Sequence, residues 1–190
     1  GRVSLAIFEC KKPVIGAING AAVGIGATMT LGMDIRMVSE KARIGFVFGK
    51  IGVTPEACST WFLPRIVGMQ TALEWVYSAD ILNASQVVDA GLARSVHAPE
   101  ELLPAARELA LKFVANRSPV AIALARQMMY RNSAMPSPRT AHEVDSLSMY
   151  YSSLGDGKEG VQSFLEKRDP VFTSKASAMP DFYPWWESEQ

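Results

Sequence analysis

Cysteine, histidine and net charge are all scarce in this chain, and each scarcity excludes a class of protein. Two cysteines among 190 residues do not make a disulfide framework, which fits a reducing compartment. The 19 basic and 19 acidic residues balance, so overall charge favours neither nucleic acid nor an anionic membrane as a partner. The two histidines belong to no His-Glu-x-x-His motif, and the cysteines are not paired at metal-ligand spacing. We therefore predict no metal site and no nucleic-acid partner.

Long apolar runs are also missing. A membrane-spanning helix needs about 20 consecutive apolar residues, and no segment reaches that length although 48% of the residues are hydrophobic. Residues 1–6 are not followed by the apolar core of a signal peptide, and residues 188–190 (SEQ) are not a peroxisomal address. We predict a cytoplasmic protein with a real hydrophobic core and no membrane partner.

What the chain does contain is a covered strand followed by a glycine-rich turn. Residues 14–18 are apolar on both faces, which is typical of a buried strand. Gly20, Gly24 and Gly26 match neither the dinucleotide fingerprint nor the P-loop. Free N–H groups at a helix start attract a phosphate or an acyl oxyanion, whereas a tight packing turn between strand and helix explains the same glycines equally well.

Strand and helix signals alternate in the first half of the chain, and helical signals alone follow. Thr54, Pro55 and Glu56 have the composition of a helix start. The other expected helices cover residues 3–10, 27–32, 69–78, 84–90, 99–113, 120–130, 141–151 and 159–167, and short strands cover 34–38, 42–46 and 94–97. We predict a strand-rich core over residues 1–98, then a helical oligomerisation region over 99–190 that ends in a packed aromatic tail at 180–186.

Short motifs, in a consistent order, carry a resemblance to one family. They are residues 13–20 (PVIGAING), 34–36 (DIR), 41–46 (KARIGF), 87–93 (VVDAGLA), 159–161 (EGV), 164–168 (FLEKR) and 170–172 (PVF). With them the chain resembles the crotonase superfamily, also called the enoyl-CoA hydratase/isomerase superfamily. Val87 and Ala93 depart from the family pattern, which often has alanine and valine at those two positions.

The resemblance implies an α/β fold of the ClpP/crotonase type. This fold is a spiral of ββα units with a C-terminal helical region, assembled as a homo-trimer or a hexamer. Family members carry an earlier segment with half of the oxyanion hole and much of the CoA adenine site, whereas this chain begins at Gly1 without it. We therefore expect a fragment or a processed product, whose partners include its own missing N-terminal segment.

The resemblance also implies where an acyl group binds. In the family, the thioester oxygen lies between two backbone N–H groups, one of them in the glycine-rich loop, and alignment on Asn19 and Gly20 makes that donor Ile25. The family's hydratases carry one glutamate three residues after this donor and another twenty residues later. Thr28 and Phe48 occupy those positions here, and neither transfers a proton as a carboxylate does. Hydration is therefore disfavoured.

One acid remains near the predicted site. Residues 53–60 (VTPEACST) and 62–66 (FLPRI) are similar to one group of Δ3-Δ2-enoyl-CoA isomerases, in which the glutamate of a Pro-Glu-Ala/Gly-Cys-Ser-Ser motif is the catalytic base. Spacing alone explains Glu56 better as a first-turn acid that complements a helix dipole. With the resemblance, we predict that Glu56 is the base of an isomerase and the Ile25 N–H its oxyanion donor. The predicted substrate contacts are Ala22, Gly24, Gly26, Thr28, Phe48, Val53, Pro55 and Lys167.

Two other functions stay open at this point. A different acyl-CoA reaction on the same scaffold, hydrolase- or dehalogenase-like, would use Glu56 as a nucleophile. A truncated subunit that only binds CoA or assembles would not be catalytic. If the protein is an enzyme of either kind, its expected partner is an acyl-CoA substrate, and no cofactor is expected beyond the coenzyme A of that substrate.

Overall fold

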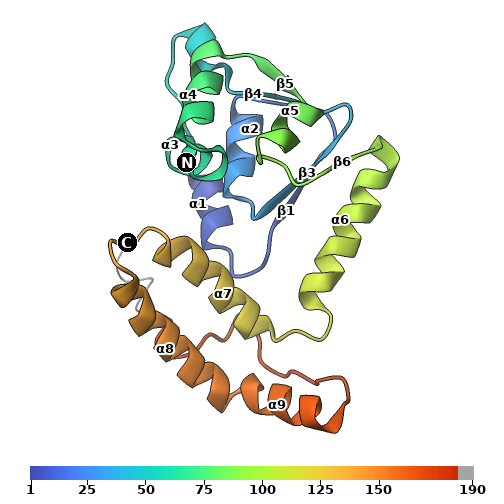
Figure 1. The fold of residues 1–190 in the computed structure, drawn as a ribbon, viewed down its shortest axis with the longest axis vertical. Helices are drawn as coiled ribbons and strands as arrows, with labels where there is room; N and C mark the ends of the chain where they lie inside the picture. The colour runs from blue at the N-terminus through green and yellow to red at the C-terminus, as the bar shows by residue number, and fades with distance from the viewer. Residues whose placement is uncertain (184–190) are drawn as a thin grey trace. The chain divides into compact units, whose positions relative to one another are not determined.

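The computed structural model describes residues 1–183, which form two compact units (Figure 1). The first unit contains residues 1–10 and 14–110, and the second contains residues 11–13 and the chain from residue 111 onward. Within the described residues, no helix is long and apolar enough to cross a membrane.

The first unit is built on two small sheets, each with three strands among the described residues. In one sheet β1 (Ile15–Ile18) pairs in parallel with β3 (Ile35–Ser39), and β3 pairs in parallel with β6 (Val96–His97). In the other, β4 (Arg43–Gly45) lies between β2 (Ala21–Val23), which is parallel to it, and the antiparallel β5 (Ile81–Asn83). Strands β1 to β4 thus alternate between the two sheets, whereas β4 and β5 are neighbours in one sheet.

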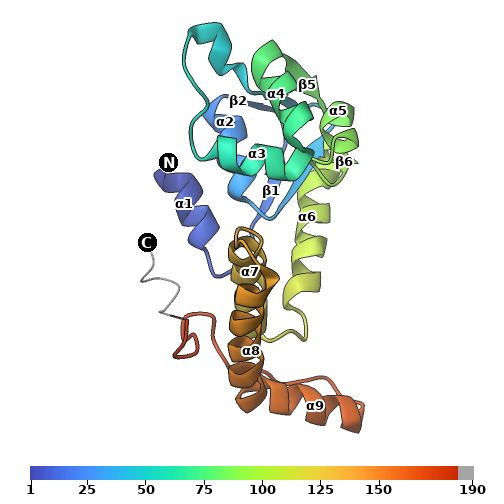
Figure 2. The same cartoon turned by 60° about the vertical axis from the view of Figure 1, so that its left-hand side comes forward.

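Helices surround these sheets. They are α1 (Arg2–Glu9), α2 (Ile25–Thr28), the 3-10 helices η1 (Met29–Gly32) and η2 (Val47–Ile51), α3 (Ser59–Val67), α4 (Met69–Ser78), α5 (Ala84–Asp89) and α6 (Pro99–Val114). Helix α3 packs beside the segment formed by α2 and η1 (Figure 2). The core includes Phe46 stacked on Trp75 at 6.1 Å between ring centroids. Leu102 and Ala106 of α6 pack on Met37 of β3.

The expected strands and most of the expected helices are confirmed within a few residues. The short helix at residues 84–90 forms because Asn83 and Gln86 make a reciprocal capping box, and Gly91 then turns the chain with φ of 77°. The helix start predicted at Thr54 is wrong. Residues 53–56 have no regular secondary structure, and α3 begins only at Ser59.

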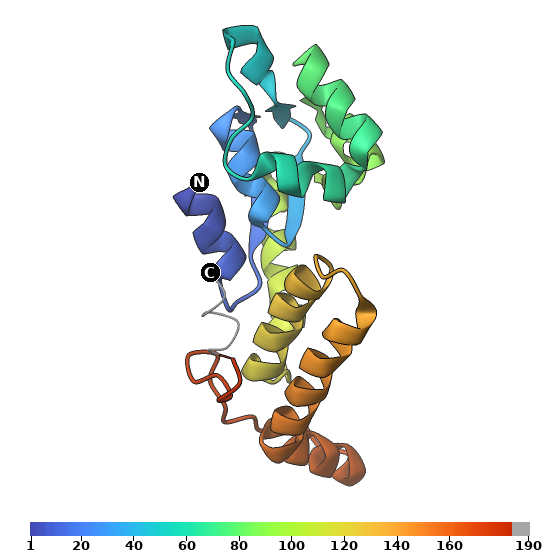
Figure 3. The ribbon, with the colours of Figure 1, turned by 90° about the vertical axis from the view of Figure 1, so that its left-hand side faces the viewer.

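The second unit is helical. Its described helices are α7 (Pro119–Asn132), α8 (Pro138–Leu154) and α9 (Asp156–Glu166), and α7 and α8 run side by side (Figure 3). Val120, Leu124 and Val144 form a core that Phe182 and Tyr183 complete. The packed tail is therefore confirmed for Phe182 and Tyr183, while Trp185 and Trp186 lie outside the described residues.

Candidate functional site

The glycine-rich loop turns the chain sharply from β2 into α2. Gly24 has φ of 58° and ψ of −123°, a conformation that only glycine adopts without strain. Its N–H donates to the carbonyl oxygen of Gly45 at 2.9 Å, which ties the loop to β4. Its carbonyl oxygen accepts from the N–H groups of Ala27 at 2.9 Å and Thr28 at 3.0 Å. Gly24 therefore both shapes the turn and starts the helix.

Ile25 is the first residue of α2. The N–H groups of a first helical turn have no acceptor within the helix, and the hydrogen bonds of the described residues provide none for Ile25. The residue is 55% exposed. The structure thus leaves a backbone donor at the position where the sequence predicted one, although its role as an oxyanion donor stays a prediction.

Thr28 and Glu56 come together from different parts of the chain. Oγ1 of Thr28, a fully buried residue at the end of α2, donates to Oε1 of Glu56 at 2.6 Å. Thr28 follows Ile25 by three residues, which is about 4.5 Å along a helix axis. The Glu56 carboxylate is therefore bound at the end of one short helical turn, and the Ile25 N–H lies at the start of the same turn.

The backbone that directly follows Glu56 keeps this residue outside a regular helix. Ala57 and Cys58 both adopt the left-handed conformation, with φ of 57° and 60°. Each such non-glycine residue costs about 1–2 kcal/mol, and strain of this kind gathers at functional sites. The Ser59 N–H then donates to the Glu56 carbonyl oxygen at 3.0 Å as α3 begins. This left-handed pair is the physical reason why the helix predicted at Thr54 does not form.

The remaining predicted contacts have different surroundings. Ala22 and Phe48 are buried, Pro55 is half-buried and Val53 is 51% exposed. The Val53 N–H donates to the Phe48 carbonyl oxygen at 3.2 Å, which closes the loop that leads to Glu56. Gly26 lies inside α2, with room for a methyl group against Ala22. Their contacts with substrate stay predictions.

Lys167, the last predicted contact, belongs to the second unit. It is exposed and ends α9 with φ of 56°. Nothing in that unit tests its contact with substrate, which stays a prediction.

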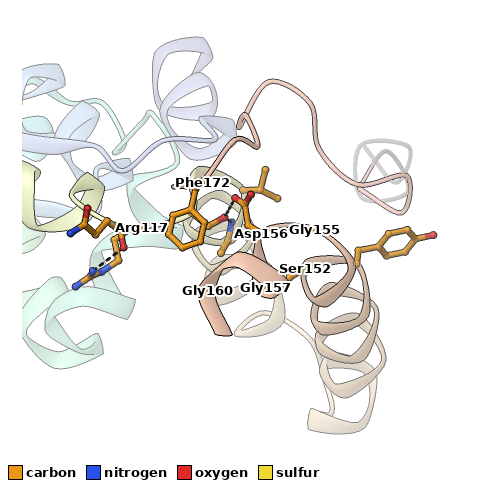
Figure 4. A pocket seen from close by; sticks show the side chains of 12 residues that line it. Arg117, Ser152, Gly155, Asp156, Gly157, Gly160 and Phe172 are labelled. Carbon is orange, nitrogen blue, oxygen red and sulfur yellow. Dashed lines mark hydrogen bonds between the residues drawn. The ribbon is translucent and has the colours of Figure 1, made fainter. Parts of the chain in front are cut away.

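The second unit also contains a cavity that sequence reasoning missed. It has a volume of about 300 Å³ and lies between the start of α7, the end of α8 and the start of α9 (Figure 4). Asp156 on its wall accepts from the hydroxyl groups of Ser118 at 2.6 Å and Ser174 at 2.8 Å. Burial raises the pKa of Asp156, but the hydrogen bonds from Ser118 and Ser174 outweigh it and leave this pKa below its ordinary value. This carboxylate therefore already has its partners.

Metal ligation finds no support in the described part of the chain. No three histidine, cysteine, aspartate or glutamate residues gather there as a metal site requires. Cys58 is half-buried.

Comparison with known proteins identifies relatives of this chain. Residues 2–175 match the family model described as enoyl-CoA hydratase/isomerase. The chain is 42% identical over 175 residues to the enoyl-CoA hydratase AFT3-1 of Alternaria alternata, covering 90% of this chain and 58% of that protein. It is 36% identical over 173 residues to the 1,2-epoxyphenylacetyl-CoA isomerase of Escherichia coli K12, covering 89% of this chain and 64% of that protein.

Solved structures confirm the predicted fold class. A probable enoyl-CoA hydratase/isomerase from Mycobacterium abscessus superposes with a TM-score of 0.83 at 30% identity, covering 88% of this chain and 68% of that one. The α/β arrangement with a helical C-terminal region is therefore the crotonase fold. The chain spans less than two thirds of the length of these two curated relatives.

Proposed function

Because this chain belongs to the enoyl-CoA hydratase/isomerase family, we propose that it acts on an acyl-CoA and shifts a carbon–carbon double bond from C3 to C2. The observation that carries the proposal is the Glu56 carboxylate, held at 2.6 Å by Thr28 at the end of the turn that begins with the Ile25 N–H. A single base beside an oxyanion donor is what this isomerisation requires.

The reaction needs one carboxylate and no co-reactant. Glu56 removes a proton from C2 of a 3-enoyl-CoA, and the C–H electron pair enters a dienolate whose negative charge resides on the thioester oxygen. The Ile25 N–H donates to that oxygen, and a preorganised donor of this type is worth about 3–4 kcal/mol. Glu56 then returns the same proton to C4. The substrate gains and loses no atoms, and Glu56 ends as the carboxylate it began as.

Hydration is the second candidate, because the relative at 42% identity is named a hydratase. Two residues argue against it. Phe48, which replaces one of the expected glutamates, is buried and has no group that binds or activates water. Thr28 replaces the other, and its hydroxyl donates to Glu56. Neither of the two positions that the family's two-carboxylate mechanism uses therefore holds a carboxylate here.

The test compares the purified protein, expressed from its complete coding sequence, with Glu56→Gln. The assay follows conversion of a trans-3-enoyl-CoA to its 2-enoyl isomer. We expect the substitution to lower kcat by about 10²- to 10⁴-fold, the usual contribution of a general base. Equal rates in the two proteins would remove Glu56 from the mechanism, and no isomerisation by either would refute the function.

The proposed assembly and requirements follow the family. We propose a homo-trimer or a hexamer that needs only the coenzyme A of its substrate and no metal or redox cofactor. Sedimentation equilibrium measures the assembly. Isomerase activity that persists after dialysis against a chelator would support a reaction without a metal, and activity that returns only with added metal would contradict it.

A further inference from the structure

We propose that Thr28 is a positioning residue for Glu56, and that its hydroxyl determines which carboxylate oxygen carries the proton. This inference rests on the proposed function, because it assumes that Glu56 is the base. The sequence identified Thr28 as a position where a hydratase would have an acid, and as a predicted substrate contact. The structure points to a different role, as the donor that orients the acid contributed by another loop.

The hydroxyl of Thr28 has one hydrogen and three oxygen atoms within reach. The carbonyl oxygens of Gly24 and Ile25 lie 3.3 Å and 3.4 Å from Oγ1. Oε1 of Glu56 lies at 2.6 Å, the length expected of a hydroxyl that donates to a charged carboxylate. Threonine in a helix commonly donates to a carbonyl of the preceding turn. Here the shorter and charge-assisted bond is the one to Glu56.

Burial of Thr28 fixes the donor of this hydrogen bond in place. Thr28 is fully buried, and its backbone N–H donates to Gly24 within the same turn. The hydroxyl is thus fixed relative to the Ile25 N–H. Glu56, by contrast, is an exposed residue in a segment without regular structure. Without Thr28, the hydrogen bonds of the described residues include no other donor to its carboxylate.

In this geometry the two carboxylate oxygens of Glu56 have different roles. Oε1 accepts from Thr28 throughout the reaction, and Oε2 takes the proton from C2 as the C2–H bond breaks and the O–H bond forms. The proton then leaves Oε2 as the C4–H bond forms. Thr28 keeps its own hydrogen, so it donates a hydrogen bond but transfers no proton. A single oxygen held in place serves both carbons.

The test compares Thr28→Val, Thr28→Ser and Thr30→Val in the isomerisation assay. Valine replaces the hydroxyl with a methyl group, whereas serine keeps the donor. Thr30 is a matched control because it is also buried, and its hydroxyl donates at 2.7 Å to the carbonyl oxygen of Ala27 instead of Glu56. We expect Thr28→Val to lower kcat by about 10- to 100-fold, as small misplacements of catalytic groups do, with KM nearly unchanged. Thr28→Ser, which keeps the donor, should recover most of the kcat that Thr28→Val loses, and Thr30→Val should keep kcat close to that of the unchanged protein.

The outcomes separate this inference from the proposed function. If Glu56→Gln is inactive and Thr28→Val retains full kcat, the role of Thr28 is refuted and the isomerase function stands. If the unchanged protein is inactive, or Glu56→Gln retains full activity, both proposals fail. A Thr28→Val protein that loses kcat only to the extent that Thr30→Val does would show a structural role and refute positioning. Thermal unfolding of each variant checks that it folds.

Discussion

Nε of Arg36 donates to the carbonyl oxygen of Leu92, 56 residues further along the chain, at 2.7 Å. The Nη1 group of this buried guanidinium also donates to the carbonyl oxygens of Met33 at 2.6 Å and Thr30 at 3.1 Å. One side chain thus joins β3, the turn after α5 and the 3-10 helix that directly follows Thr28. The buried guanidinium of Arg36 therefore holds together the segments around the candidate site by donating to their backbone carbonyl oxygens.

Arg36→Leu should be strongly destabilising. The variant removes the donors of several buried carbonyl oxygens, and each such group left without a partner costs about 1–3 kcal/mol. We expect a loss of roughly 3 kcal/mol or more in the free energy of unfolding, measured by urea denaturation. Arg65→Leu is the control, because Arg65 is a surface arginine that donates at 2.8 Å to Trp61 in its own helix. A loss for Arg36→Leu no larger than for Arg65→Leu would contradict this account.

Local signals in the sequence predicted most of the elements, but not the contacts that assemble the site. The capping residues Asn83 and Gln86 act within a few residues of each other, so a sequence pattern reveals the helix that they begin. The bond between Thr28 and Glu56 spans 28 residues, and nothing local to either residue indicates the other. The proline before Glu56 suggested a helix start, whereas the left-handed pair after it overrides that local preference. The family resemblance was enough to single out Glu56 in the sequence, whereas its hydrogen-bond partner Thr28 became visible only in the fold.

Gly24→Ala should disturb the site more than its neighbour Gly26→Ala. A Cβ atom at Gly24 meets open space and one at Gly26 would lie 4.0 Å from Cβ of Ala22, an ordinary contact, so steric clashes do not separate the two variants. Gly24 alone has a positive φ, 58°, that alanine adopts only with strain. We expect Gly24→Ala to lose about 1–3 kcal/mol of stability, and Gly26→Ala to lose none, because alanine favours a helix. Thermal unfolding compares them, and equal Tm values would contradict a requirement for glycine at position 24.

The pH dependence of the second unit should follow Glu159. The hydrogen bond from Arg168, together with one from the Val171 N–H, lowers the pKa of Glu159 to about 2. Because the folded-state pKa of Glu159 lies below its unfolded value of about 4.3, ionised Glu159 stabilises the folded state fully above about pH 4.3. This stabilisation is lost as the pH falls through about 2.

A carbon-13 NMR titration of the side-chain carboxyl groups measures this pKa directly. Glu159→Gln identifies the signal by its absence. Arg168→Met should move the midpoint of Glu159 up toward the ordinary glutamate value, because it removes the main donor. A Glu159 midpoint near 4 in the unchanged protein would contradict the geometry of this ion pair.

The central claim is that one carboxylate, Glu56, moves a double bond and that the site does not add water. The most direct test measures isomerisation of a 3-enoyl-CoA and hydration of a 2-enoyl-CoA with the same preparation and with Glu56→Gln. We predict that kcat/KM for isomerisation exceeds that for hydration by about 100-fold or more, and that Glu56→Gln lowers the kcat of isomerisation by about 10²- to 10⁴-fold, on the scale of general-base catalysis. Hydration that equals or exceeds isomerisation, and that survives in Glu56→Gln, would contradict the account.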